Sequence, residues 1–321
     1  MTPVPFTLFS PFRLLFVAAL TLVAATLTRA DAAGYEPGKT YRDAKGYVEF
    51  QPGSLPIIIT APHGGEKGPS SIPDRTEGVL VSDANTQDLA RQIAAEFSRR
   101  TGRQVHLVLN LLHRRKLDPN REIKEAAQGN PDAEAAWRNY HAAIDRAKAS
   151  ALAAYGFAFL VDVHGHGHAI PRLELGYALD NAALNVTDAA LDAADVGPHT
   201  TINDLAARTK EPFSKLLRGP GSLGDLFQQH GFRAVPSPQE PQPGNNLFFA
   251  GGYTVRRHAA WPDSTGVDGV QIECNRDARA TPKSRAQLAA AIADVLTTFL
   301  AQRYAYTLPA PSARPAVARS E

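Results

Sequence analysis

Short apolar runs alternate along this chain with longer stretches whose apolar residues recur at helical spacing. The apolar runs lie at 55–61, 104–112, 157–165 and 269–274. The helical stretches lie at 83–102, 130–156 and 284–305, with a shorter one at 225–232. Strands that alternate with helices favour a largely parallel sheet, and uniformly apolar strands favour burial on both faces. The sequence therefore predicts an α/β fold with a mostly parallel or mixed central sheet and helices on both faces.

The composition is that of an ordinary globular protein. The 321 residues are 44% hydrophobic and 21% charged, which is enough for a sizeable core. Lys and Arg number 34 and Asp and Glu 32, so the formal net charge is +2. This balance gives no support for a nucleic-acid-binding surface, which needs clustered basic residues. We expect residues 33–307 to form a single α/β domain.

The two ends of the chain differ from its middle. Arg13 precedes an apolar run at 14–27, and Ala30 and Ala32 supply the small-residue pattern of a cleavage site. This run has the length of a secretory signal and is short for a membrane span, so we expect a signal peptide at 1–32. The mature protein is then exported, periplasmic or secreted, with no membrane attachment after cleavage. A tail rich in Pro, Ala and Arg, 308–321, is expected to be disordered.

The first predicted strand runs directly into the segment PHGGE, with His63 and Glu66 on either side of two glycines. Ligands of α/β sheets collect at the carboxyl ends of the strands. Imidazole and carboxylate are also the usual ligands of a catalytic zinc. A histidine near a glutamate in a loop is nevertheless more often a solvated pair, so this motif alone is weak.

The third strand ends in DVHGHGH. Asp162 and His164 share one face of that strand because side chains alternate with period two. His164 emerges directly from the buried run and is the favoured metal ligand, whereas His166 and His168 belong to a polar loop or an adventitious metal-binding tract. Asp162 either orients a ligand or is a buried acid with its own partners.

Glu273 interrupts the apolar fourth strand, VQIEC. A buried carboxylate needs a partner or takes a raised pKa. It is therefore either half of a structural ion pair or a general base that takes a proton from water.

Arginines gather after the second strand. Arg114 and Arg121 lie in HRRKLDPNRE, where Asn120 precedes Arg121, and Arg256 lies in GGYTVRRH. Solvation explains most surface arginines, but a guanidinium beside a metal site would bind a substrate carboxylate in a fork.

As an ensemble, these segments resemble the N-formylglutamate amidohydrolase family and, more distantly, the zinc carboxypeptidases. The matching pieces are APHGGE (61–66), DPNR (118–121), VDVHGHG (161–167), GGYTVRR (251–257) and QIECNRDAR (271–279). The resemblance implies one zinc ion held by His63, Glu66 and His164, with Glu273 as general base and acid. It implies that Arg121, with Asn120, reads a substrate carboxylate, and that the enzyme hydrolyses amide bonds.

The roles of the arginines follow from this scheme. Either Arg114 or Arg121 stabilises the oxyanion, and a second arginine, with Arg256 as a further candidate, docks the carboxylate of a small-molecule or peptide substrate.

Two other functions remain open from the sequence. An exported zinc carboxypeptidase or peptidoglycan amidase would use the same residues. A periplasmic metal-binding protein without catalysis would need only the HGHGH tract.

Overall fold

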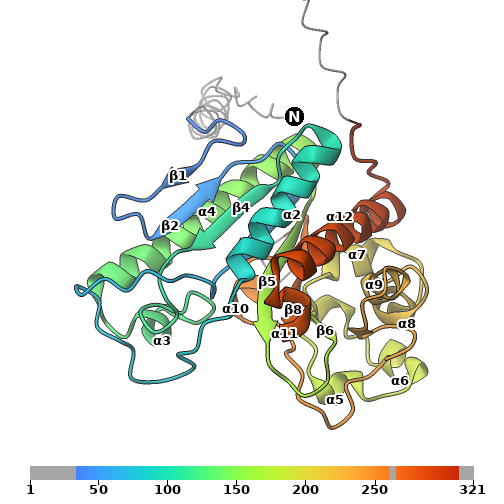
Figure 1. Ribbon diagram of the computed structural model, residues 1–321. Coiled ribbons are helices and arrows are strands. Elements are labelled where there is room, and N and C mark those ends of the chain that lie inside the picture. Colours follow the sequence, from blue (N-terminus) through green and yellow to red (C-terminus); the bar gives the residue numbers. More distant parts are fainter. Residues whose placement is uncertain (1–33, 260–264, 311–321) are drawn as a thin grey trace, which may run out of the picture. The chain divides into compact units, whose positions relative to one another are not determined.

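The computed structural model describes residues 34–259 and 265–310 (Figure 1). The predicted signal peptide and most of the predicted tail lie outside the described residues. From Pro37 onwards the chain belongs to one structural unit. None of the described helices is long and apolar enough to cross a membrane.

Within the described ranges, eight strands form one mixed sheet. They are β1 (Tyr41–Arg42), β2 (Val48–Gln51), β3 (Ile57–Ala61), β4 (His106–Asn110), β5 (Ala158–His166), β6 (Leu173–Gly176), β7 (Ala234–Val235) and β8 (Val267–Asn275). Their order in the sheet is β1-β2-β4-β3-β5-β8-β6-β7. The four central strands, β4, β3, β5 and β8, are parallel, whereas β2 and β6 join them antiparallel. Central parallel strands flanked by antiparallel ones confirm the predicted mixed α/β sheet.

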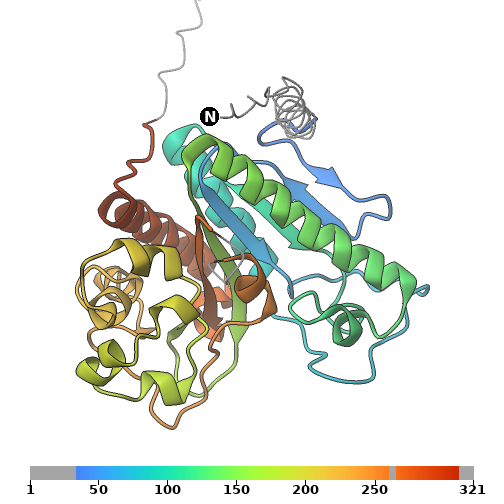
Figure 2. The same ribbon diagram turned by 180° about the vertical axis from the view of Figure 1, so that it is seen from behind.

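Helices cover both faces of this sheet (Figures 1 and 2). Helices α2 (Thr86–Thr101) and α12 (Pro282–Tyr304) pack on one face, and α4 (Pro131–Tyr155) and α10 (Tyr253–His258) pack on the other. The remaining helices are short: α3 (Ile123–Ala127), α5 (Asn181–Leu184), α6 (Asp188–Ala193), η2 (Gly197–His199), α7 (Asn203–Arg208), α8 (Phe213–Arg218), α9 (Leu223–Gln229) and α11 (Arg276–Ala280).

Odd-numbered and even-numbered residues of the central strands pack into two different cores. In β3, Ile57 and Ile59 pack into the core under α2 and α12, whereas Ile58 packs into the core under α4. In β5, Phe159 belongs to the first core and Leu160 to the second. This alternation is the period-two geometry of a strand buried on both faces. The even-numbered polar residues of β5 therefore emerge on the α4 side of the sheet.

The strand β4 carries a buried histidine that makes the fold acid-sensitive. His106 is fully buried, and its Nδ1 accepts a hydrogen bond from the backbone N–H of Gly53 (2.9 Å). Burial lowers the pKa of His106 to about 4 from its ordinary value of 6.5. Between these values the unfolded chain binds a proton that the folded chain does not, so stability falls as the pH falls.

We expect His106 to account for about 3 kcal/mol of stability loss between pH 6.5 and pH 4, since each unit of pKa is worth about 1.4 kcal/mol. Urea unfolding of the wild type and of His106→Gln across this range tests it. As the pH falls, the free energy of unfolding of His106→Gln should decrease less than that of the wild type. The exposed control His230→Gln should lose as much as the wild type. Equal pH slopes for all three proteins would contradict the assignment.

Candidate metal centre and active-site cavity

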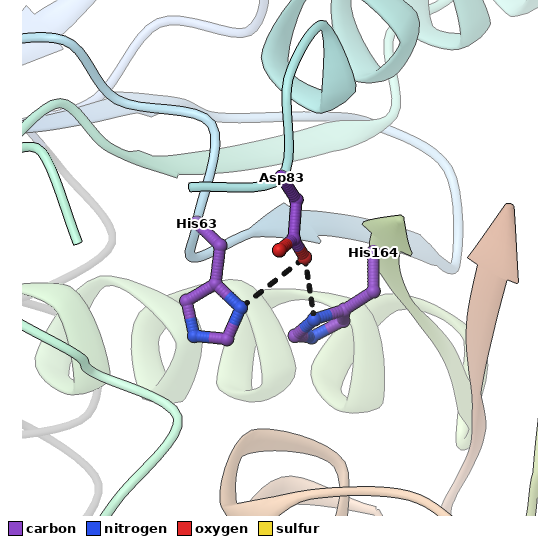
Figure 3. A group of neighbouring side chains, drawn as sticks. All are labelled: His63, Asp83 and His164. Atoms are coloured by element: carbon purple, nitrogen blue, oxygen red, sulfur yellow. Dashed lines mark hydrogen bonds and ion pairs between the residues drawn. The ribbon is translucent and has the colours of Figure 1, made fainter. Parts of the chain in front are cut away.

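Two histidines and an aspartate converge at the carboxyl ends of the central strands (Figure 3). His63 follows β3, His164 lies near the end of β5, and Asp83 precedes α2. The Nδ1 atoms of both rings lie 3.3 Å from the same oxygen, Asp83 Oδ2. All three side chains are buried, so they can hold a cation away from bulk water.

Each imidazole is held from behind by a buried carboxylate. His63 donates through Nε2–H to Asp118 Oδ1 (2.6 Å), and His164 donates through Nε2–H to Asp162 Oδ2 (2.8 Å). Asp162 is itself fixed by the hydroxyl of Thr60, which donates to Oδ1 (2.6 Å). A carboxylate that binds one ring nitrogen turns the other towards a metal and makes it a better ligand.

The donor spacing fits a tetrahedral metal ion. With metal–nitrogen and metal–oxygen distances of about 2.1 Å, two tetrahedral ligands lie about 3.4 Å apart. The two Nδ1–Oδ2 separations are 3.3 Å. His63, Asp83 and His164 could therefore hold a zinc-like cation with little rearrangement.

The electrostatics of this group also favour a cation. Burial opposes charge on Asp83, yet His63 and His164 hold the pKa of its carboxyl well below the usual range. Burial likewise opposes protonation of His164, yet Asp162 and Asp83 raise its pKa well above the usual value. His164 thus holds a proton beside a charged Asp83 where a metal would sit, and a metal would replace that proton.

Glu66 does not take part in this group. The structure places its side chain in an exposed position, and it is not among the residues that line the cavity in the described part of the chain. The backbone at Gly65 packs against Asn110 and Leu111, where a Cβ would come within 2.6 Å of backbone atoms. The backbone therefore stays beside the segment that follows β4, where Lys67 bridges Leu112, and the Glu66 side chain is exposed. Glu66 thus lies apart from the two histidines, and the carboxylate that lies next to both of them is that of Asp83.

Glu273 lies beside this group in the neighbouring strand. It pairs with His164 in the β5–β8 register, and its Oε1 is 3.8 Å from His164 Nδ1. Gln271 donates to that oxygen (2.9 Å), while Oε2 is buried without a hydrogen-bond partner among the described residues. Burial, together with the charges of Asp83 and Glu174, raises the pKa of Glu273 to about 8. A carboxyl with this pKa can accept and release a proton near neutral pH.

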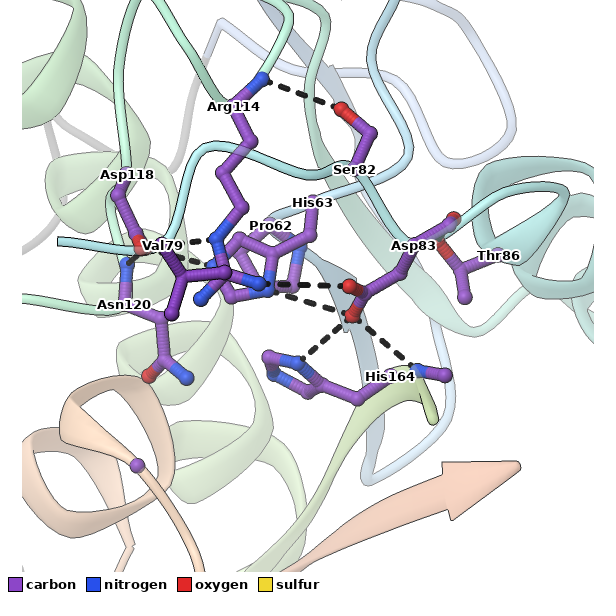
Figure 4. Close-up of polar contacts among 12 residues, drawn as sticks. Pro62, His63, Val79, Ser82, Asp83, Thr86, Arg114, Asp118, Asn120 and His164 are labelled. Atoms are coloured by element: carbon purple, nitrogen blue, oxygen red, sulfur yellow. Dashed lines mark hydrogen bonds and ion pairs between the residues drawn. The ribbon is translucent and has the colours of Figure 1, made fainter. Parts of the chain in front are cut away.

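Arg114 joins the two aspartates that flank His63 (Figure 4). Its Nε donates to Asp118 Oδ2 (2.9 Å), and its Nη1 lies 3.4 Å from Asp83 Oδ1. The guanidinium is largely buried and faces the same cavity as Glu273. Through these contacts Arg114 positions the carboxylates of Asp83 and Asp118. The sequence alone did not suggest this role.

The other predicted substrate contacts divide into two sets. Asn120 and Arg121 both line the cavity. Asn120 Oδ1 accepts from the backbone of Thr254 (2.7 Å), and Arg121 donates to Glu125 Oε1 (3.0 Å). Arg256 is not among the lining residues of the described chain, and it donates to the carbonyl of Gly251 (2.9 Å). Asn120 and Arg121 therefore lie at the cavity, whereas Arg256 does not line it.

The cavity has a volume of about 910 Å³. Its floor is formed by the group around His63, and two arginines that the sequence did not single out, Arg276 and Arg279, also line it. Arg276 is exposed, whereas Arg279 is buried and donates to the carbonyl of Cys274 (3.1 Å). They lie three and six residues after Glu273, just beyond the end of β8, and that position was the signal that could have found them.

Part of the chain matches a known family model. Residues 125–279 match the family model described as N-formylglutamate amidohydrolase. No curated protein shows significant similarity to the chain.

Several solved structures are similar to this one at low identity. A gene product from Agrobacterium tumefaciens is 14% identical, with a TM-score of 0.49, over 82% of this chain and 97% of that one. An N-formylglutamate amidohydrolase from Ralstonia eutropha is 14% identical, with a TM-score of 0.45, over 78% and 95%. An N-acetylmuramyl-L-alanine amidase from Mycobacterium smegmatis is 14% identical, with a TM-score of 0.32, over 77% and 97%.

The matched segment contains two of the residues on which the motif comparison depended, His164 and Glu273. Over these residues the chain is similar to a family of amidohydrolases, which hydrolyse amide bonds. The resemblance of this chain to the N-formylglutamate amidohydrolase family is thereby confirmed over residues 125–279.

Proposed function

We propose that this protein is a metal-dependent amidohydrolase that binds one catalytic zinc ion at His63, Asp83 and His164. The observation that carries the proposal is the convergence of two Nδ1 atoms on Asp83 Oδ2, each at 3.3 Å, with a buried carboxylate behind each ring. Two imidazoles, one carboxylate and an open side towards a cavity form a typical catalytic zinc site. Zinc suits this mixed nitrogen and oxygen donor set.

When bound, the metal would polarise the amide carbonyl and lower the pKa of water at the site. Glu273 is the group that moves protons. Its Oε2 has no protein partner among the described residues, and its pKa of about 8 suits uptake of a proton from water and delivery to the leaving nitrogen. Gln271 holds the other carboxylate oxygen, which fixes the direction of Oε2.

Positive side chains around the cavity suit a substrate with a carboxylate. Arg121, with Asn120 beside it, lies on one wall, and Arg276 lies on the rim. A guanidinium pairs with a carboxylate through two parallel hydrogen bonds and so orients the substrate. We infer that the substrates are N-acyl amino acids, of which N-formyl amino acids are the smallest members. The export signal expected at 1–32 makes the periplasm or the exterior the proposed location.

Chelation and reconstitution test this function. Purified protein is depleted of metal, and its hydrolysis of N-formyl and N-acetyl amino acids, of a dipeptide and of a muramyl peptide is measured before and after zinc is added. We expect depletion to lower kcat/KM on the N-acyl amino acids at least 100-fold and zinc to restore it. Full activity after depletion, or preference for the muramyl peptide or the dipeptide, would contradict the proposal.

A further inference from the structure

A second group of metal-binding side chains lies on the same cavity, apart from the ligands named above. His166, His168 and Glu174 place their donor atoms within 4.8 Å of one another. His166 ends β5, and His168 follows two residues later. Glu174 lies on β6, which is separated from β5 in the sheet by β8. Both histidines line the cavity, so an ion could reach them from solvent.

The donor atoms of this group make hydrogen bonds that a bound cation would replace. His168 Nδ1 lies 2.9 Å from Glu174 Oε1. His166 donates through Nε2–H to the carbonyl of Arg172 (2.8 Å), which leaves the lone pair on its Nδ1, the atom that accepts from the backbone of His168 (3.1 Å). A neutral imidazole whose other nitrogen binds a backbone carbonyl is in the form that binds metals.

The burial of Glu174 gives a reason for a cation at this place. Glu174 is fully buried and lies directly opposite Glu273 in the β6–β8 register, so two buried carboxylates face each other on one side of the sheet. Arg172 Nε is 3.9 Å from Glu174 Oε1 and makes no hydrogen bond within the described structure. Burying a carboxylate is costly unless its charge is compensated, and a coordinated metal ion would do so.

We propose that His166, His168 and Glu174 form a second zinc-binding site in the wall of the cavity. The ion replaces the proton between His168 and Glu174, and the donor set of two imidazoles and one carboxylate matches the preferences of zinc. This site uses none of the catalytic ligands, so it is independent of the proposed amidohydrolase function.

An ion in the second site would also order Phe249, which lines the cavity. The backbone N–H of Phe249 donates to Glu174 Oε2 (2.9 Å), and the Phe249 ring stacks on the His168 ring with centroids 4.6 Å apart. An ion bound to His168 and Glu174 would fix both groups that Phe249 contacts. Because Phe249 lines the cavity, its loss of order would weaken substrate binding more than the chemical step.

Zinc stoichiometry of the full chain at a buffered zinc concentration tests the proposal. We expect two ions per chain in the wild type, one in His168→Ala, one in Asp83→Asn and none in the double variant. The exposed histidine variant His230→Ala is the matched control and should keep two. Circular dichroism checks that each variant is folded, and Glu174→Gln serves as a second route to the same loss if His168→Ala does not fold.

The outcomes separate the two sites. If the wild type holds one ion per chain and Asp83→Asn removes it, the second site is overturned. It is also overturned if a folded His168→Ala variant still holds two ions. If the wild type holds one ion per chain and His168→Ala removes it, the result would support the second site and count against the catalytic one. In the supported case, His168→Ala should raise KM for the N-acyl amino acid several-fold and leave kcat within about twofold of the wild type.

Discussion

Replacement of Glu273 by glutamine is expected to lower kcat by about 10²–10⁴, the usual contribution of a general acid–base group. Glutamine keeps the size of the side chain and can still bond to Gln271, but it cannot take up a proton. The variant should bind zinc as the wild type does, because Glu273 is not one of the three converging ligands. Steady-state kinetics on an N-acyl amino acid, with metal content measured on the same sample, provides the test.

Glu66→Gln is the matched control for this change. It alters the same residue type at an exposed position outside the cavity lining and should retain full activity. A Glu273→Gln variant that holds zinc and remains fully active would show that another group moves the proton.

Asp83→Asn is expected to lower zinc affinity and kcat/KM by at least 100-fold. The amide would be a poorer ligand, and Arg114 would lose the charge that its Nη1 faces at 3.4 Å. Asp118→Asn removes the carboxylate behind His63 and the charge that Arg114 Nε binds, but no proposed metal ligand, so its effect on zinc affinity should be smaller, about 10–100-fold. Zinc titrations of the two variants measure this ranking. A weaker effect at Asp83 than at Asp118 would contradict the proposed ligand set.

Much of the fold could be predicted because the strands have a strong local signal. The runs 55–59 and 157–161 are apolar throughout, and such runs form buried strands wherever helices cover both faces. The short strands β1, β2, β6 and β7 were missed. The strands β1 and β7 are only two residues long, and β6 carries the buried Glu174. The places of β6 and β7 in the sheet are fixed by neighbours distant in sequence, β8 for β6 and β6 for β7.

The candidate site was predictable where it lies at strand ends. His63, His164 and Glu273 each follow or end an apolar run, and the carboxyl ends of parallel strands meet at one edge. The structure brings these three residues together as that rule requires.

Asp83 was missed because its place before a helix is typical of a capping residue. In the structure its side chain makes no cap, and its backbone instead pairs with His63, whose carbonyl accepts from the Asp83 N–H (3.1 Å). Glu66 was named as a ligand because it is close to His63 in sequence and because the family resemblance implied it. Nearness in sequence gave no information about the direction in which the chain leaves the strand.

The most direct test of the account is the position of zinc in a crystal of the zinc-loaded protein, found by anomalous scattering at the zinc absorption edge. The account predicts a peak within coordination distance of His63, Asp83 and His164, present in Glu66→Gln crystals and absent from Asp83→Asn crystals. A peak coordinated by Glu66, or no peak beside His63 and His164 in the loaded wild type, would contradict it.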